Sequence, residues 1–418
     1  MKDVFLIGTY SSRFGKFADK SYRDLVQEAY LEVLNDAGME NGDLIDFAYF
    51  GNCRMHAVGQ PLIRGQACFA PLVQEGLFPE RVPVINVEGA CSTASMALHS
   101  AWKDILSGQS QLTLAMGVEK LFFPNNPVGM LKAFEEGMDR FTPKETLDVY
   151  QKAGELIGQP FATSPDRTLF MDTYGMQAKY HMYKHGTTQR QIAFGAAKNH
   201  NFGAKNPKAQ YRFEQTVDQV LEDRVVSYPL TRAMCAPIGD GAASAILCSG
   251  EVVKRLGLKD RTVRIRASVL GSGTERPFDL DTPEIGERLS KKAYEASGLG
   301  PEDIDLAEVH DATAYGELRQ VENLGFCSKG EGGILAERGE TMLNGSIPVN
   351  TSGGLLSRGH PIGASGLAQT HELTVQLRGR AGKRQVAKHR LAIAENGGGA
   401  LGVEEAAMCI HILEAPSK

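Results

Sequence analysis

An internal repeat of one α/β pattern limits the fold more than any other feature of this sequence. Residues 25–51 combine an amphipathic helix, a glycine that ends it and a short apolar strand, and residues 289–311 repeat that order. The two helix-ending glycines, Gly38 and Gly298, lie 260 residues apart. Because this order of helix, glycine and strand also recurs by chance in α/β proteins, a single pair of similar segments is not enough to establish a duplication.

A second pair of segments supports the repeat. Each contains a short strand that ends at an asparagine, Asn86 or Asn350, and each strand is followed by small residues and then by a helix. The offset between the two asparagines is 264 residues, close to the first offset. The sequence therefore predicts two similar α/β halves that meet between residues 250 and 270.

The segment from Lys120 to Asp172 interrupts the first half. It has poor hydrophobic periodicity and many proline, glycine and charged residues. A stretch of this length without a clear helix or strand is usually a functional lid or a mobile insertion. We expect it to decide which substrate is bound.

Size and charge favour a globular enzyme without nucleic-acid or membrane partners. The chain has 418 residues, and its 45 Lys and Arg against 50 Asp and Glu give a net charge of −5. This balance excludes a basic nucleic-acid-binding coat and an acidic disordered tail. No apolar run approaches the roughly 18 residues of a membrane span, and the N-terminus does not resemble a signal peptide.

The cysteines predict a reducing compartment. There are seven, an odd number, and none forms a C-x-x-C pair. This spacing disfavours a disulfide framework and a zinc ribbon, so we expect a cytoplasmic protein without a metal site.

Cys91 is the candidate nucleophile. It follows a predicted strand, lies among small residues and precedes a helix. The free N–H groups of a helix N-terminus stabilise a thiolate, so we expect the pKa of this thiol to be lowered. The alternative is an inert buried cysteine, which is the usual role of the other six, with Cys53 the least certain of them.

Two histidines are candidate acid–base groups. His360 lies in a glycine-rich turn, where it could act as a general base or stabilise an oxyanion, and His310 ends the strand of the second repeat. Active sites of α/β folds gather at such strand ends. The alternative for each is a histidine that only packs in the core.

Glycine-rich turns and a basic run are candidate binding elements. The segment Glu395–Gly402 matches G-x-G-x-x-G, but the 16 residues after it leave no room for a dinucleotide-binding unit, so we interpret Gly398 as part of a close-packed turn that lines a pocket. Ser352 and Gly353 belong to the other glycine-rich turn, the one that contains His360. The basic run could hold phosphates, although a solvated face is the more usual explanation; it comprises Lys198, His200, Lys205, Lys208 and Arg212.

In these residues the chain resembles the thiolase superfamily, and most closely its branch of sterol-carrier-protein-type and archaeal acetyl-CoA acetyltransferases. The resemblance extends from about residue 4 to residue 410 in the order of the family motifs. The matching motifs are Gly89-Ala-Cys91-Ser, Ala115-Met-Gly-Val-Glu-Lys120, Tyr183-Lys-His-Gly-Thr-Thr188, Lys198-Asn-His200, Asn206-Pro-Lys-Ala-Gln210, the segment from Leu230 to Asp240, Glu308-Val-His310-Asp311 and Gly359-His360-Pro-Ile-Gly.

The resemblance implies a five-layered αβαβα fold, built from two βαβαβ halves with an inserted loop domain that covers the CoA channel. On this basis residues 1–119 and 226–260 form the N-terminal half, residues 120–225 the loop domain and residues 261–418 the C-terminal half. It also implies a homodimer or a tetramer, and a small zinc-ribbon/OB-fold subunit as a partner.

The same resemblance implies a thiolase mechanism. Cys91 takes the acyl group as a thioester, His360 activates it and His310 serves the oxyanion hole, with CoA as carrier and no tightly bound cofactor or metal. Candidate CoA-binding residues are Lys198, Lys205, Arg212, Ser352, Gly353 and Gly398.

One departure from the family leaves a role open. Thiolases use a second cysteine to move the α-proton, but here neither expected position holds a thiol, and either Glu395 or Asn396 takes the place of one of them. A larger or unusual substrate, aryl or branched with a carboxylate as in benzoylsuccinyl-CoA thiolases, would fit this change. The alternatives are a ketosynthase-like condensing enzyme and a non-catalytic acyl-CoA-binding scaffold subunit.

Overall fold

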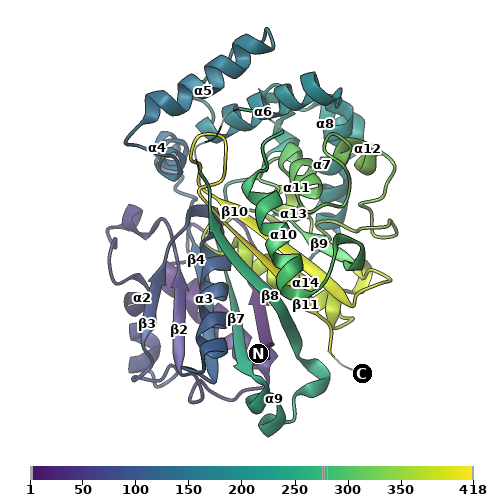
Figure 1. Cartoon of the computed structure of the whole chain (residues 1–418). Coiled ribbons are helices and arrows are strands. Elements are labelled where there is room, and N and C mark those ends of the chain that lie inside the picture. The colour runs from purple at the N-terminus through teal and green to yellow at the C-terminus, as the bar shows by residue number, and fades with distance from the viewer. Residues whose placement is uncertain (1–2, 275, 277, 280, 417–418) are drawn as a thin grey trace.

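The computed structural model describes residues 3–274, 276, 278–279 and 281–416. The N-terminal half forms a five-stranded mixed sheet whose order is β3-β2-β4-β7-β1 (Figure 1). Its strands are β1 (Val4–Ser11), β2 (Phe47–Gly51), β3 (Val84–Val87), β4 (Leu112–Glu119) and β7 (Gly241–Ser249).

The C-terminal half repeats this strand order in reverse along the sheet. Its strands follow as β8-β11-β10-β9, and a parallel bridge between Ala307 and Val349 takes the place of a fifth strand. Pairing of β1 with β8 joins the halves into one sheet of the described chain. The strands are β8 (Val263–Ser272), β9 (Leu306–Glu308), β10 (Leu391–Gly398) and β11 (Ala407–Glu414).

Equivalent side chains join the beginnings of neighbouring parallel strands in the two halves. The carboxylate of Asp46 accepts hydrogen bonds from the backbone N–H groups of Gln111 and Leu112, and Asp305 does the same for Arg390 and Leu391. These aspartates occur at the repeat offset that the sequence indicates. The predicted duplication is therefore visible in backbone order and in side-chain contacts.

Three apolar cores hold five layers together, and the central core packs against the strands of both halves. One core packs α1 and α2 against one face of the N-terminal sheet, a central core packs α3 and α14 between the two halves, and a third packs α10 and α11 against the C-terminal strands. This arrangement confirms the expected five-layered α/β fold. The helices are α1 (Tyr22–Ala37), α2 (Arg64–Gln74), α3 (Thr93–Ser107), α10 (Ile285–Ser297), α11 (Ala314–Asn323) and α14 (Ser365–Leu377).

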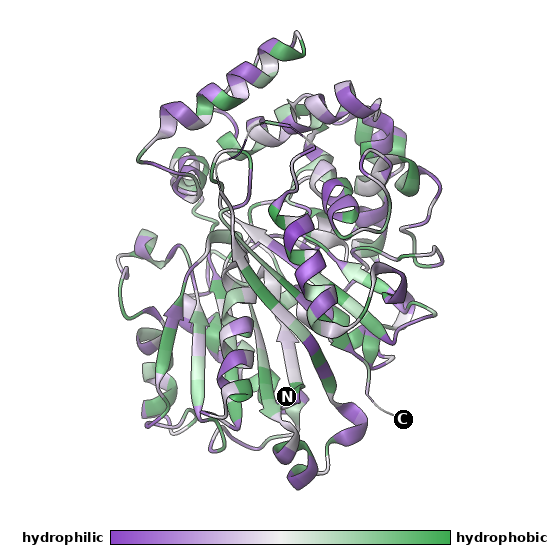
Figure 2. Cartoon of the chain, viewed as in Figure 1, coloured by the Kyte–Doolittle hydropathy of each residue, from purple (hydrophilic) through white to green (hydrophobic). Residues whose placement is uncertain are grey.

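Hydropathy follows the layers. Figure 2 shows apolar residues concentrated in the strands and polar residues on the outward side of α10. None of the helices in the described part of the chain is long and apolar enough to cross a membrane.

The segment from Lys120 to Asp172 is more regular than the sequence indicates. It contains two helices, so the prediction that it lacks clear elements was wrong; Pro143 in the first turn of α5 is a helix-start signal that the weak periodicity concealed. Further helices and a small hairpin complete the insertion, whose exact boundaries stay a prediction. These elements are α4 (Pro127–Lys132), α5 (Pro143–Leu156), α6 (Leu169–His185), α7 (Gln189–Ala204), α8 (Val217–Glu222), β5 (Val225–Ser227) and β6 (Leu230–Thr231); α9 (Gly250–Leu256), α12 (Gly332–Glu337) and α13 (Gly354–Arg358) lie outside it.

Candidate active site

Cys91 lies in a tight turn between β3 and α3. The turn is a short 3₁₀ helix from Ala90 to Ser92, and Ala90 has a φ of 49°, in the left-handed region that most residues avoid. Gly398 of β10 packs directly on this turn: a Cβ at that position would lie 2.3 Å from the backbone nitrogen of Ser92 and 2.7 Å from that of Cys91. Only glycine permits this close approach.

The structure brings Cys91 and His360 together from residues 269 positions apart. Nε2 of His360 lies 3.3 Å from Sγ of Cys91, and Nδ1 lies 2.8 Å from Oγ of Ser365. The Ser365 hydroxyl donates its own proton to the Pro361 carbonyl oxygen, at 3.1 Å, so it accepts from His360 Nδ1–H. The lone pair of Nε2 therefore faces the thiol, as a general base requires.

His310 has the opposite tautomer. The Asn396 amide nitrogen lies 3.1 Å from His310 Nδ1, while the amide oxygen accepts a hydrogen bond from Ser95 Oγ at 2.9 Å. The amide therefore donates to Nδ1, and the ring proton of His310 is on Nε2. The rings of His310 and His360 meet edge to face, with centroids 5.1 Å apart. Asn396 thus positions His310 as a hydrogen-bond donor.

Burial keeps all three reacting groups neutral. It raises the pKa of the Cys91 thiol to about 12, lowers the pKa of His310 to about 4 and lowers that of His360 well below its ordinary value. Hydrogen bonding from the backbone N–H of Gly399 favours the Cys91 thiolate, but desolvation is larger. The pKa of the Cys91 thiol is thus raised rather than lowered as expected, because desolvation in the turn outweighs the stabilising backbone N–H groups.

The same three residues could hold a metal ion. The Cys91 sulfur and one ring nitrogen of each histidine lie within 4.8 Å of one another, and no other group of this kind occurs among the described residues. Sulfur and imidazole suit soft ions such as Zn²⁺. The same atoms, however, also form a complete catalytic pair, with Cys91 as the nucleophile and His360 as its general base.

Glu395 lies in the wall behind His310. Its Oε2 accepts a hydrogen bond from the His310 backbone N–H at 2.8 Å, and its Oε1 is buried without a hydrogen-bond partner. Burial raises the pKa of this carboxyl to about 8. The side chain is thus a buried acid that titrates close to neutral pH.

A mostly apolar cavity of about 200 Å³ ends at the reacting groups. Cys91, His310, His360 and Gly398 line it, and Arg224, which is exposed, lies at its solvent end with Arg167 and Asp166. The insertion supplies apolar wall residues, namely Phe134, Phe170, Met171 and Tyr174. A flexible arm with an anionic end would fit this distribution.

Three candidate CoA-binding residues are turned away from the cavity. Lys198 is 3% exposed and pairs with Glu317 at 3.0 Å, and Ser352 donates a hydrogen bond to the buried Glu308. Gly353 packs against Gly203. Their expected contact with CoA was therefore wrong, because each lies inside the C-terminal half or its contact with α7. Lys205 and Arg212 are exposed outside the cavity, so their role stays a prediction.

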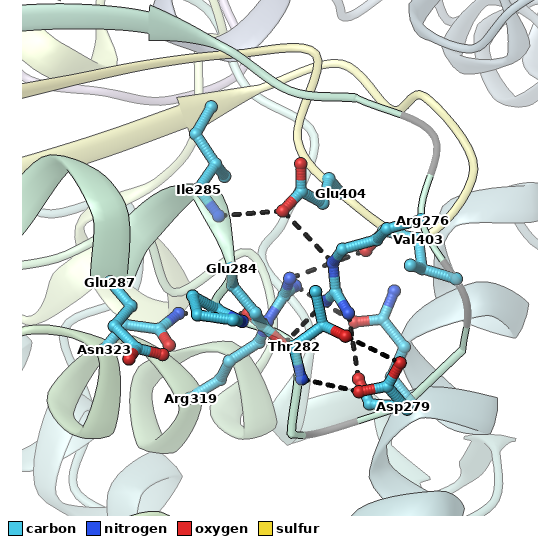
Figure 3. A network of polar contacts seen from close by, with 12 residues as sticks. Arg276, Asp279, Thr282, Glu284, Ile285, Glu287, Arg319, Asn323, Val403 and Glu404 are labelled. Atoms are coloured by element: carbon cyan, nitrogen blue, oxygen red, sulfur yellow. Dashed lines mark hydrogen bonds and ion pairs between the residues drawn. The ribbon is translucent and has the colours of Figure 1, made fainter.

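Sequence reasoning missed several residues of the site. Ser95 and Ser365 set the histidine tautomers, yet nothing in a single sequence distinguishes them from other helical serines. Glu405 lines the cavity and belongs to a buried ion network that joins α6, the start of α10, α11 and the turn at 404–405. Figure 3 shows the part of this network around Arg276, Glu284, Arg319 and Glu404. Arg319 lies in this network, 2.5 Å from Glu284 and 3.2 Å from Glu405.

Comparison with known families accounts for most of the chain. Residues 4–226 match the family model described as "Thiolase, N-terminal domain", and residues 280–413 match "Thiolase C-terminal domain-like". The chain is 37% identical over 407 residues to the acetyl-CoA acetyltransferase of Methanothermobacter thermautotrophicus, which covers 96% of this chain and 98% of that relative.

Two further relatives have similar identity. Sterol carrier protein 2 of Oryctolagus cuniculus is 36% identical, covering 94% of this chain and 69% of its own length. The benzoylsuccinyl-CoA thiolase subunit BbsB of Thauera aromatica is 33% identical, and the match covers 92% of this chain and 91% of that relative. Among solved structures, the Ltp2-ChsH2(DUF35) aldolase has a TM-score of 0.76 at 20% identity, covering 100% of this chain and 99% of that one.

Proposed function

The chain belongs to the thiolase family of acyltransferases, and we propose that it exchanges acyl groups between CoA thioesters through a thioester on Cys91. The reaction is thiolytic cleavage of a 3-oxoacyl-CoA, or the reverse Claisen condensation. The contact of 3.3 Å between Cys91 Sγ and His360 Nε2, at the inner end of a cavity, carries this proposal.

Acylation begins from a neutral pair. In thiolysis, His360 Nε2 takes the thiol proton while the sulfur attacks the 3-oxo carbonyl carbon. The C2–C3 bond then breaks, and C2 takes a proton from the group that moves the α-proton and leaves as the shorter acyl-CoA. The acyl group stays on Cys91 until free CoA removes it. In condensation, the sulfur attacks the thioester carbonyl carbon of the donor, and the imidazolium returns the proton to the departing CoA sulfur. Because the proton moves as the bond forms, no isolated thiolate has to persist in the buried turn. The hydrogen bond from His360 Nδ1 to Ser365 keeps the ring oriented during both transfers.

His310 stabilises the oxyanion that forms on the carbonyl. Its Nε2–H is the free donor, and its pKa, lowered to about 4 by burial, keeps the ring neutral. A donor fixed before the reaction costs no reorganisation when charge develops on the oxygen.

Glu395 is the group we assign to α-proton transfer in condensation. The amide of Asn396 cannot accept a proton and is held by His310 and Ser95. Glu395 has one unpartnered oxygen and a pKa near 8, which matches the need to take and return a proton. Glu405 is less suited, because Arg319 and Gln320 hold its oxygens.

The substrate we propose is a 3-oxoacyl-CoA larger than acetoacetyl-CoA, with an aryl or branched acyl group. The relative named a benzoylsuccinyl-CoA thiolase subunit supports this choice, as does the missing second cysteine. Arg167 and Arg224 would hold the CoA phosphates. That relative is also described as a subunit, which supports a partner for this chain. The partner we propose is a small zinc-ribbon/OB-fold subunit, in a cytoplasmic complex.

Intact-protein mass spectrometry tests the covalent step. Incubation with an excess of 3-oxoacyl-CoA should add one acyl group to the wild-type chain, and Cys91→Ser should carry none. Adding CoA should remove the group from the wild type as a new acyl-CoA. A wild type that stays unmodified with every ester, or an adduct that survives in Cys91→Ser, would contradict the proposal.

A further inference from the structure

A second cavity also ends at Cys91. It has a volume of about 260 Å³ and shares Cys91, Phe134 and Phe170 with the first cavity, so the two cavities lie side by side at these residues. Near the sulfur its wall is formed by Cys53 and Ile362, together with the three shared residues. Nothing in the thioester mechanism described above uses this space.

The geometry of a 3-oxoacyl-CoA requires such a second space. The 3-oxo carbon that Cys91 attacks also carries an oxygen, the C2 methylene that leads to the CoA arm and the rest of the acyl chain, and these groups diverge around it. If the CoA arm fills the first cavity and the oxygen faces His310, the acyl chain has to leave in another direction. The second cavity is the space that lies beside the first at Cys91.

Arg54 lies at the far side of this cavity, at the junction with a third one. Its side chain is 13% exposed, and its Nη1 donates to the Ala133 carbonyl oxygen at 2.9 Å. The third cavity, of about 510 Å³, shares Arg54, Leu121 and Ala133 with the second, and its wall includes Phe122, Phe123 and Met130. The guanidinium therefore lies on the route along which an acyl chain would extend.

A carboxylate of the protein itself shows what binds at this junction. Glu136 Oε2 lies 2.5 Å from Arg54 Nη1 and 3.1 Å from His56 Nε2, although the Glu136 side chain is 55% exposed. Nε and Nη2 of Arg54 have no hydrogen-bond partner among the described residues. A second carboxylate could therefore use the free edge of the guanidinium or displace Glu136.

The other charged groups of the cavity do not cancel this site. Arg64 lines the same wall and donates to the carbonyl oxygens of Pro61 and Asn52. Glu88 also lines it, but it is exposed and accepts a hydrogen bond from the Ala90 backbone N–H at 2.7 Å. Among the charged groups that line the second cavity, Arg54 is thus partly desolvated and has hydrogen-bond donors left for a ligand.

We propose that the second cavity binds the acyl group and that Arg54 selects 3-oxoacyl groups with a carboxylate remote from the thioester. This inference rests on the proposed thiolase function and specifies its substrate class. A neutral chain would instead pass Arg54 into the third cavity, and it would desolvate the free edge of the guanidinium without giving that edge a hydrogen-bond acceptor.

A matched pair of substrates tests the selection. The esters 3-oxoadipyl-CoA and 3-oxohexanoyl-CoA have the same chain length and differ in the terminal carboxylate, and kcat/KM for their thiolysis is measured. We expect the wild type to favour the dicarboxylic ester. Arg54→Gln should lower the ratio of the two kcat/KM values by about 10- to 100-fold, mainly through KM, because a hydrogen-bonded charge contact is lost.

Three further variants separate selection from folding. Arg54→Lys keeps the charge and should retain part of the preference, and Glu136→Gln removes the competing carboxylate and should lower KM for the dicarboxylic ester. Arg140→Gln is the matched control, because Arg140 lies in the same segment but pairs with Glu135 outside the three cavities. It should leave the ratio unchanged.

The outcomes distinguish this inference from the function on which it rests. Acyl-enzyme with both esters, together with a ratio that Arg54→Gln does not change, overturns the role of Arg54 alone. A wild type that prefers 3-oxohexanoyl-CoA, with efficiency rising further for 3-oxodecanoyl-CoA, overturns it in favour of a long neutral chain. No acyl-enzyme with any ester overturns the thiolase function as well.

Discussion

At the scale of single residues, two serines give the active-site histidines different roles. Ser365 accepts from His360 Nδ1, so the Nε2 lone pair of His360 faces the thiol. Ser95 orients the Asn396 amide, so that His310 keeps its proton on Nε2. One imidazole is therefore ready to accept a proton and the other to donate a hydrogen bond, although both are buried and neutral.

Glu395 is the residue at which pH should act most directly. Burial raises the pKa of its carboxyl from 4.5 to about 8, so the native state holds a proton that the unfolded state has already released. Between about pH 5 and pH 8 the native state thus binds more protons, and the free energy of unfolding falls as pH rises. Below that window both states are protonated and the effect disappears.

Glu395→Gln should remove this pH dependence, because glutamine is neutral and has nearly the same shape. We expect the variant and the wild type to have similar unfolding free energies at pH 5, and the variant to be more stable at pH 9 by a few kcal/mol. Urea unfolding at pH 5, 7 and 9 measures the difference. Acyl-enzyme formation should persist in the variant, while condensation falls at least about 100-fold.

An exposed glutamate provides the control for this prediction. Glu40→Gln should change neither the pH dependence of stability nor the rate of condensation. If Glu395→Gln were less stable than the wild type by the same amount at every pH, the native carboxyl would be ionised and could not be the acid described above.

At the scale of elements, the ion network around Arg319 joins segments that the chain order separates. This arginine of α11 contacts Glu284 before α10, Glu405 in the turn after β10 and Gln177 of α6. The network therefore fixes one wall of the first cavity and attaches the insertion to the C-terminal half.

Removing the arginine should cost much more than an exposed ion pair is worth. Arg319→Leu leaves the carboxylates of Glu284 and Glu405 buried without this partner, and we expect the free energy of unfolding to fall by about 3–5 kcal/mol. Urea unfolding at pH 7 measures the loss, and Arg338→Leu, at an exposed arginine, should stay within about 0.5 kcal/mol of the wild type. A similar small change in Arg319→Leu would mean that water screens the network.

At the scale of the whole molecule, one edge of the sheet lacks a cover. Among the described residues β3 pairs with β2 alone, at the edge of the sheet (Figure 1). Ile85 on this strand is 46% exposed. Leu62 and Ile63 are also exposed, just before α2, whose first turn bonds to Asn86 of β3. An apolar, unpaired edge strand is a site for pairing with another chain.

A second copy of this chain is the partner we expect at that edge, as the family resemblance also implies. Light scattering after size-exclusion chromatography should give the wild type twice the monomer mass of 45.3 kDa. Ile85→Arg should shift the protein toward the monomer, because it places a charge in the interface. Leu31→Arg, on the outer helix α1, should remain dimeric. A dimer unaffected by Ile85→Arg would place the interface elsewhere.

Local pattern was sufficient to predict much of this protein. Helix-ending glycines and apolar strands predict the two halves, because these signals depend on only a few neighbouring residues and the same order of signals occurs twice in the chain. The same kind of pattern singles out Cys91 and His360 and predicts the close packing at Gly398. Together with the order of the motifs, this predicted the thiolase family and its five-layered fold, which the comparisons and the structure confirm.

Contacts between distant residues decided the rest. Lys198 belongs to a basic run in the sequence, yet it is buried and pairs with Glu317. The tautomers of His310 and His360 depend on Ser95 and Ser365, which no local sequence signal distinguishes. The pKa of Cys91 is likewise raised by burial that only the packed chain produces. Burial, hydrogen-bond partners and cavities arise when segments from both halves and the insertion pack together, so only the tertiary structure could determine them.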